Sequence, residues 1–266
     1  MPTEYEYDEN GNLTKDLNKN ITAIQYNCLN LPSRVMFANG NSISYLYDAA
    51  GRKLRTVHVL EGDSVTTDYC GNVVYENGVP QILLTEAGYV SLTDGKYHYY
   101  LKDHQGNNRV VVDEEGTVEE VNHYYPFGGV FSSTGDAQPY KYNGKELDRK
   151  GGLDWYDYGA RMYDAALGRF MKTDRFSEKY VSLSPYQYGA NNPVNNIDVN
   201  GDSLLLNKTS VAEAMLAIYN GLEDGTNLKM KFNNGVLDPT SIEAHAKVTS
   251  DFFLQDLYEI CLLYTS

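Results

Sequence analysis

The sequence has 266 residues, enough for one large β domain or two smaller ones with a sizeable core. Its formal net charge of -14 argues against nucleic-acid binding by the bulk of the chain, because phosphate contacts need a basic patch. No apolar run is long enough to span a bilayer, and no signal peptide is visible at the start. The 24 tyrosines and 23 glycines favour β-strands joined by tight turns.

A tyrosine-rich repeat occupies the first part of the chain. The segment 5–13 reads YEYDENGNL and recurs at 45–54 as YLYDAAGRKL, with a related unit at 26–32 and a looser copy at 99–110. Alternating Tyr-x-Tyr places both rings on one face of a strand, and Asp-x-x-Gly makes the turn because glycine takes positive φ. A single hairpin cannot bury its face alone, so we expect the copies to form one spiralling sheet.

A dense group of motifs follows the repeats. The segments are HYYPFG at 123–128, PYKYNGKE at 139–146, WYDYGARMYD at 155–164 and NPVNNIDVNG at 192–201. Together with the Tyr-Asp repeats, they resemble the YD repeats and the core-domain signature of Rhs/YD-repeat polymorphic toxins. The resemblance covers residues 1 to about 202.

The expected fold class is mainly β: a stacked-hairpin YD-repeat sheet that forms part of a shell, followed by a small α+β C-terminal segment. We divide the chain into hairpins that end a longer array (1–96), an Rhs-associated core domain (97–202) and the truncated start of a variable region or connector (203–260). Residues 261–266, CLLYTS, are what TGT-CTC-TTA-TAC-ACA-TCT encodes, which resembles a sequencing adapter. We interpret them as translated adapter; the alternative is a short apolar strand.

The segment after residue 202 has both helical and strand patterns. A helix is expected from Thr209 or Ser210, because Glu213 stands at capping-box spacing from Ser210. A strand over 228–232 then turns at 233–235 into a short hairpin, and a second helix is expected from about Ile242 to Leu257. We favour a connector before the toxin over the toxin's own first elements.

The resemblance implies a curved wall that closes into a hollow cocoon around a C-terminal toxin. This chain would hold the last repeats and the core, which cannot close a cocoon alone. The implied partners are the chain's own C-terminal toxin, which is missing, a cognate immunity protein and the export machinery. The implied location is secreted or on the surface of a bacterium that competes with other cells.

The resemblance also implies a self-cleavage site near residue 202. In self-cleaving members, two aspartates near the end of the core, assisted by an arginine, release the cargo; the matching positions are Arg161, Asp174 and Asp198. Two carboxylates held close cannot both ionise, so one serves as acid and the other as base for water. Aspartyl self-cleavage is the only enzymatic activity expected of this chain.

The sequence departs from the self-cleaving pattern at three positions. Arg175 and Val199 stand where the family has proline, and Asp202 stands where self-cleaving members have an apolar residue. In the alternative interpretation, the two aspartates are turn and strand-end residues whose side chains form hydrogen bonds with the nearby backbone.

No metal or cofactor site is expected, because the five histidines and three cysteines do not occur at the sequence spacing typical of metal ligands. The cysteines are interpreted as small buried hydrophobic residues: Cys28, Cys70 and Cys261. An alternative function of a different class is extracellular adhesion or carbohydrate binding, since tyrosine rings stack on sugars. Buried rings favour a shell, and a contiguous exposed aromatic patch favours a binder.

Overall fold

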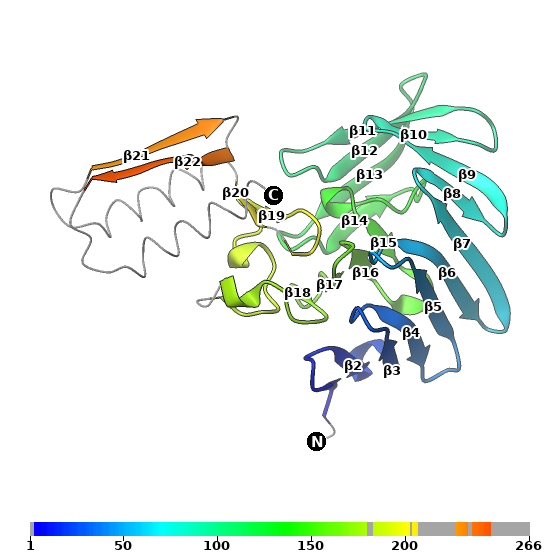
Figure 1. The fold of residues 1–266 in the computed structure, drawn as a ribbon. Helices are drawn as coiled ribbons and strands as arrows, with labels where there is room; N and C mark the ends of the chain where they lie inside the picture. The colour runs from blue at the N-terminus through cyan, green and yellow to red at the C-terminus, as the bar shows by residue number, and fades with distance from the viewer. Residues whose placement is uncertain (1–2, 180–182, 203, 207–226, 234–235, 246–266) are drawn as a thin grey trace. The chain divides into compact units, whose positions relative to one another are not determined.

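A long β-meander dominates the computed structural model, which describes residues 3–179, 183–202, 204–206, 227–233 and 236–245. The chain divides into two units, residues 1–174 and 175–266. The first unit contains a 14-stranded antiparallel sheet and a 4-stranded sheet (Figure 1). In the long sheet each strand pairs with its neighbours in sequence, so the hairpin array predicted from the repeats is confirmed.

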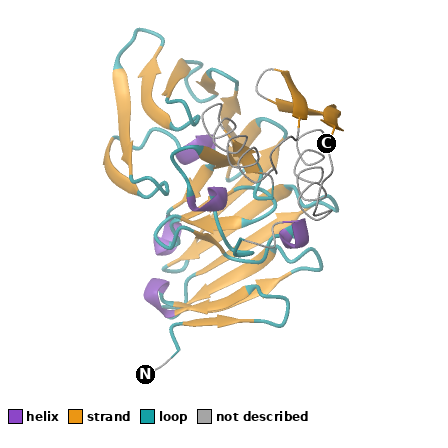
Figure 2. Cartoon of the chain, turned by 90° about the vertical axis from the view of Figure 1, so that its left-hand side faces the viewer, coloured by secondary structure: helices purple, strands orange, loops and turns teal. Residues whose placement is uncertain are grey.

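The strands of the long sheet are β1 (Tyr5–Tyr7), β2 (Leu13–Asp16), β3 (Ile21–Tyr26), β4 (Pro32–Phe37), β5 (Ser42–Tyr47), β6 (Lys53–Leu60), β7 (Asp63–Cys70), β8 (Val73–Glu76), β9 (Val79–Leu84), β10 (Gly88–Ser91), β11 (Tyr97–Lys102), β12 (Asn108–Asp113), β13 (Val118–Tyr124) and β14 (Val130–Thr134). The small sheet contains β15 (Glu146–Asp148), β16 (Trp155–Asp157), β17 (Met162–Asp164) and β18 (Arg169–Phe170). The described helices of this unit are short 3-10 turns (Figure 2): η1 (Leu17–Lys19), η2 (Tyr142–Gly144) and η3 (Lys150–Gly152).

One five-residue turn recurs through the first unit. In each copy the amide of the first residue donates to the carbonyl of the fifth, and the amide of the fourth donates to the carbonyl of the first. The fourth residue has positive φ in every copy, which is why it is glycine in all copies but one. The copies span 8–12, 27–31, 37–41, 48–52, 103–107, 113–117, 125–129 and 141–145.

The aspartate of the Tyr-Asp repeat caps this turn with its side chain. Asp48 Oδ1 accepts hydrogen bonds from the amides two and four residues later, both at 2.9 Å. Asn27 does the same in the irregular unit at 26–32, where Asn30 replaces the glycine with a φ of 55°. Asparagine tolerates this backbone region better than most residues, so the irregular unit still forms the repeat turn.

The small sheet packs against the first half of the long sheet, and the side of the long sheet that it covers is called the inner side. Figure 1 shows the long sheet bent around it. The core between them is apolar, with Trp155 at 1% exposure and Leu153 at 0%. On β4 and β5 its members alternate, as burial of one face requires, whereas on β3 a bulge after Ile21 brings Ile24 to the same face. The members from the long sheet are Leu13, Ile21, Ile24, Val35, Phe37, Ile43 and Tyr45.

The described elements of the second unit are η4 (Ser177–Lys179), η5 (Gly189–Asn191), β19 (Asn196–Asp198), β20 (Leu204–Leu206), β21 (Asn227–Asn233) and β22 (Val236–His245). β21 and β22 pair antiparallel with Asn233 opposite Val236, so the hairpin predicted over 228–237 is confirmed.

The second C-terminal helix does not begin where the sequence pattern placed it. The prediction of helix from Ile242 is wrong over 242–245, because residues Glu243, Ala244 and His245 remain paired with β21. The described residues thus do not support an α+β segment. The helix expected from residue 209, the remainder of the second helix and the tail at 261–266 lie outside the described residues.

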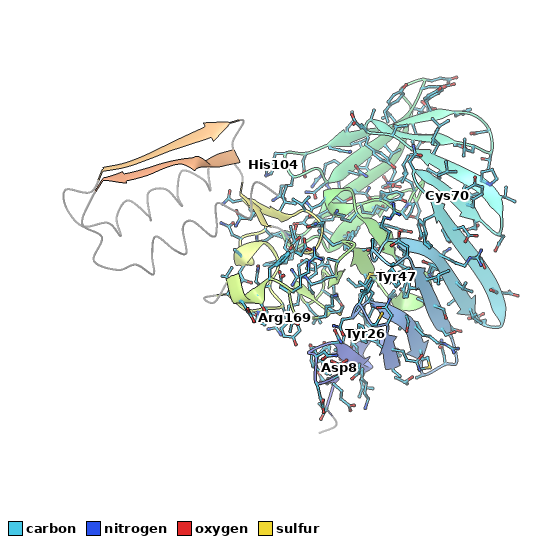
Figure 3. All side chains as sticks on the ribbon, viewed as in Figure 1. Asp8, Tyr26, Tyr47, Cys70, His104 and Arg169 are labelled. Carbon is cyan, nitrogen blue, oxygen red and sulfur yellow. The ribbon has the colours of Figure 1, made fainter. Side chains whose placement is uncertain are left out.

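The two described cysteines are exposed, so their predicted burial is wrong. Cys28 lies in the turn at 27–31, and Cys70 ends β7 in a hairpin of the long sheet (Figure 3), and both positions face solvent. Within the part of the chain that the structure describes, no helix is long and apolar enough to cross a membrane.

Candidate functional site

Two of the three predicted cleavage residues form a buried ion pair in the first unit. Arg161 occupies the turn between β16 and β17, where its carbonyl accepts from the Tyr158 amide at 3.1 Å. Its Nη2 lies 2.8 Å from Asp174 Oδ2, and the two side chains are 2% and 7% exposed. The guanidinium also lies over the Phe170 ring, 3.8 Å from its centroid. Because a buried charge needs an opposite partner, this pair fixes both side chains.

Asp198 belongs to the second unit, at the end of β19. It is 3% exposed, and its Oδ1 accepts a hydrogen bond from the Gly201 amide at 2.6 Å. This bond is the one that the strand-end interpretation expects. The role of Asp198 in cleavage stays a prediction.

Two of the three departures from the self-cleaving pattern contact each other. Arg175 Nη2 forms an ion pair with Asp202 Oδ2, and their side chains are 66% and 1% exposed. Val199, the third departure, is 47% exposed. The residue next to the expected cleavage point is therefore a buried carboxylate with a cationic partner.

The Tyr-Pro-Phe-Gly loop between β13 and β14 is held by tyrosine hydroxyls. Tyr142, Tyr163 and Tyr156 donate to the carbonyls of residues 126, 127 and 128 at 2.8, 2.8 and 2.9 Å. Gly128 has a φ of 87°, and a Cβ there would lie 2.5 Å from the Tyr142 ring. Buried tyrosines need such partners for their polar tips, so the motif joins a hairpin of the long sheet to the core segment.

A groove of about 850 Å³ lies beside this loop. Its walls include Leu147 and the ring of Tyr156, together with the loop backbone. Charged residues at its edge form pairs, Lys19–Asp164 at 3.2 Å and Arg149–Asp154 at 4.0 Å. The groove therefore offers mainly apolar surface.

Lys53 on β6 joins the long sheet to the small sheet through two carboxylates. Its Nζ lies 2.7 Å from Glu146 Oε2 on β15 and 2.6 Å from Asp157 Oδ2 on β16. Burial alone would lower the pKa of Lys53, but the charges of Asp157 and Glu146 outweigh it and raise the pKa well above its ordinary value. Burial alone would raise the pKa of Asp157, but Lys53 outweighs it and lowers that pKa.

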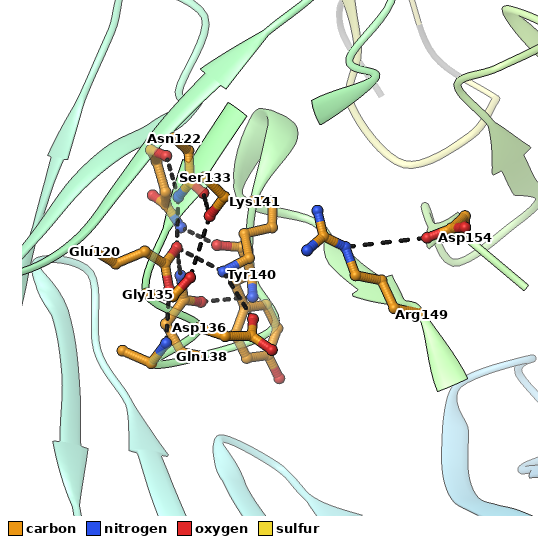
Figure 4. A network of polar contacts seen from close by, with 12 residues as sticks. Glu120, Asn122, Ser133, Gly135, Asp136, Gln138, Tyr140, Lys141, Arg149 and Asp154 are labelled. Carbon is orange, nitrogen blue, oxygen red and sulfur yellow. Dashed lines mark hydrogen bonds and ion pairs between the residues drawn. The ribbon is translucent and has the colours of Figure 1, made fainter. Parts of the chain in front are cut away.

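A second buried network lies on the inner side of β13 (Figure 4). Lys141 Nζ lies 2.5 Å from Glu120 Oε1, with side chains 1% and 0% exposed. Glu120 also accepts from the Ala137 amide at 2.8 Å and from Gln138 Nε2 at 3.3 Å. Each buried charge has a partner, as burial requires. The network fixes residues 137–141 to the long sheet.

Sequence reasoning missed both of these networks. Lys53 and Glu146 are 93 positions apart, and Glu120 and Lys141 are 21 apart. The signal available in sequence was weak: a charged residue inside an otherwise alternating strand, as with Glu120 in β13.

Among the tyrosines that the structure describes, buried rings are more numerous than well-exposed ones. Seven are buried: Tyr45, Tyr89, Tyr142, Tyr156, Tyr158, Tyr163 and Tyr188. Four are well exposed, and the other described tyrosines are partly buried: the exposed four are Tyr7, Tyr97, Tyr99 and Tyr125. Buried rings therefore outnumber exposed rings, which favours a shell over a carbohydrate binder.

Comparisons with known proteins agree with this architecture. Residues 79–194 match the family described as Teneurin YD-shell. Salivary gland surface protein 1 of Aedes aegypti is 29% identical and aligns with 83% of this chain and 7% of that protein. The tRNA nuclease WapA of Bacillus subtilis (strain 168) is 27% identical and aligns with 81% of this chain and 10% of the nuclease. A chain of the Photorhabdus luminescens Tc holotoxin pore has the same fold, with a TM-score of 0.63 at 21% identity, covering 74% of this chain and 10% of that one.

A meander of Tyr-Asp hairpins with a core segment fixed to its inner side defines a β-shell wall. The chain is similar to the YD-repeat shell proteins of the teneurin and Rhs type, through the family match over residues 79–194 and the shared fold. It spans 7–10% of the length of the curated relatives that it matches.

Proposed function

We propose that this chain is the C-terminal part of the shell of an Rhs-type polymorphic toxin, which encloses and presents a toxin domain. The observation that carries the proposal is the core segment on the inner side of the wall, joined to β6 by Lys53 and to β13 by Glu120. A relative of the same repeat type is named a tRNA nuclease, which supports a shell that carries a toxin. The partners would be the toxin, its immunity protein and the export machinery, and the location would be secreted or on the bacterial surface.

The proposal extends to release of the cargo by self-cleavage near residue 202. Arg161 bonds Asp174 and stabilises its carboxylate form, so Asp174 would take a proton from water. The resulting hydroxide would bond to the scissile carbonyl carbon. Asp198 would give its proton to the leaving amide nitrogen as the C–N bond breaks. One water is consumed, and the products are a new carboxyl end and a new amine end.

Intact mass measurement of the purified full chain tests cleavage. We expect two products from wild type and only full-length chain from Asp198→Asn and Asp174→Asn. Asp113→Asn is the matched control, because Asp113 also bonds its own backbone but lies outside the proposed site. Wild type that stays intact, or Asp198→Asn that still splits, would remove cleavage and leave the shell proposal standing.

A long sequencing read of the source locus past codon 260 tests the shell proposal separately. A reading frame that continues into a new domain supports a shell with cargo. A stop codon directly after Ser266 contradicts it.

A further inference from the structure

Asn-Gly pairs recur along the sequence, and such a pair can react within its own backbone. The amide nitrogen of the glycine can bond to the side-chain carbonyl carbon of the asparagine and close a five-membered ring, and glycine has no side chain to block the approach. The sequence has six such pairs, at 10–11, 39–40, 77–78, 143–144, 200–201 and 234–235. The structure describes the first five of them, and they differ in what holds the glycine amide.

In four of the five described pairs, the glycine amide already donates a hydrogen bond. Gly11, Gly40 and Gly144 are fourth residues of the five-residue turn, and their amides donate to the carbonyl three residues earlier at 3.0, 3.1 and 3.1 Å. The Gly201 amide donates to Asp198 Oδ1 at 2.6 Å. The nitrogen must lose its proton before it attacks, and a hydrogen bond stabilises the protonated form. These four pairs are therefore protected from ring closure.

The remaining described pair, Asn77-Gly78, forms a different turn. It is the two-residue connection between β8 and β9, and its φ values of 50° and 79° are those of a type I′ hairpin turn. The cross-strand pair that closes this hairpin is Glu76 with Val79, so the Gly78 amide takes no part in it. Among the residues that the structure describes, none accepts a hydrogen bond from that amide. Both turn residues are exposed, so solvent reaches the amide.

The pair at 39–40 matches this site in every respect but one. Asn39 and Asn77 are both exposed, and a Cβ added at either following glycine would meet no atom within 4 Å. Asn77 Oδ1 accepts from the Thr66 amide at 3.0 Å, and Asn39 Oδ1 accepts from the Asn41 amide at 3.1 Å. Such a donor stabilises the charge that develops on the oxygen during attack. The difference that remains is the hydrogen bond of the glycine amide.

We propose that Asn77 is a site of spontaneous deamidation in the folded protein, with water as the co-reactant. The Gly78 amide gives its proton to hydroxide, and its nitrogen bonds to Asn77 Cγ. Nδ2 then leaves as ammonia after it takes a proton from water, which regenerates the hydroxide. A further water opens the cyclic imide at one of its two carbonyls and gives aspartate or isoaspartate. Either product adds one negative charge, and isoaspartate adds a carbon to the backbone of a turn that holds two residues.

Mass spectrometry of the full chain after incubation in mildly alkaline buffer tests the proposal. Trypsin places Asn77 in the peptide 56–96 and Asn39 in the peptide 35–52, so one digest follows both sites. We expect Asn77 to convert at least about fivefold faster than Asn39, which is the ratio that one typical hydrogen bond gives. In guanidinium chloride both glycine amides lose their folded environment, so the two sites should convert at similar rates.

Asn77→Gln assigns the signal, because Asn72 lies in the same peptide and glutamine would have to close a larger ring. The mass shift of the peptide 56–96 should disappear in this variant, while conversion of Asn39 should continue as in wild type. Three results overturn the proposal: Asn39 that converts as fast as Asn77 in the folded protein, Asn77 that stays intact while the unfolded chain converts, and a difference that persists in guanidinium chloride. A mass shift that persists in Asn77→Gln overturns it as well.

Discussion

Lys53→Met should destabilise the protein more than a surface lysine change does. The substitution keeps a long apolar stem but leaves Glu146 and Asp157 without their shared cation. Breaking a buried ion pair costs about 3–5 kcal/mol. The three side chains are 12%, 18% and 16% exposed, so the lower end applies. We therefore expect the free energy of unfolding to fall by about 3 kcal/mol at pH 7.

Urea unfolding followed by the fluorescence of Trp155 measures this loss. Trp155 is the only tryptophan, is 1% exposed and lies on β16, the strand that carries Asp157. Lys15→Met is the control, because its pair with Glu6 is 30% and 51% exposed and should contribute less than about 1 kcal/mol. Equal losses in the two variants would refute the reasoning.

The pH dependence of the Lys53→Met effect follows from the lowered pKa of Asp157. A carboxylate whose pKa is lower in the folded state contributes stability above its unfolded pKa, about 3.9. That contribution is lost as pH falls through the folded pKa. Lys53→Met lacks this contribution at every pH. The difference in free energy of unfolding between wild type and Lys53→Met should therefore become smaller below about pH 4. A gap that stays constant down to acid unfolding would contradict this mechanism.

Two further outcomes are expected. Gly40→Ala should cost about 1–2 kcal/mol for placing alanine at positive φ with open space around it. Gly128→Ala should cost about 1–3 kcal/mol more than Gly40→Ala, because its Cβ would meet the Tyr142 ring. Equal decreases in melting temperature for the two variants would contradict this. Hydrogen bonds from the backbone of Thr117 and Glu115 lower the pKa of Asp113. In Asp113→Asn, the free energy of unfolding should therefore fall less steeply than in wild type as the pH drops below about 4. Urea unfolding over a pH series checks this, and an unchanged slope would exclude Asp113 as a contributor.

The sequence predicted the turns well because their chemistry is local. The Asp-x-x-Gly pattern places a capping side chain and a positive-φ residue within five positions, and the structure confirms it at Asp48 and Asp103. The same turn at 37–41 and 125–129 was missed because it has no aspartate. Its two backbone hydrogen bonds form without a side-chain signal.

The sequence predicted the strands better than it predicted which face of a strand is covered. Alternation at Tyr97, Tyr99 and Leu101 shows that they lie on one side, but period two is identical for either side. Which side is covered depends on residues 137–141, which contact β13 through Glu120. That contact is set by tertiary packing rather than by local pattern.

The candidate cleavage residues came from resemblance, and their role in cleavage stays a prediction. The Arg161–Asp174 pair joins residues 13 positions apart across a turn and two strands, which no periodicity predicts. The sequence did not predict the ion pair between Arg175 and Asp202 either, because each residue was identified only as a departure from the self-cleaving pattern.

The five-residue turn has a consequence for how such walls change over evolutionary time. Each copy satisfies its own backbone groups, so the gain or loss of one hairpin leaves every neighbouring turn chemically intact. Wall length is therefore a modular quantity that duplication or recombination can adjust in whole units. Under the proposed shell function, a change in the number of hairpins would change the enclosed volume while the turns between strands keep the same hydrogen bonds.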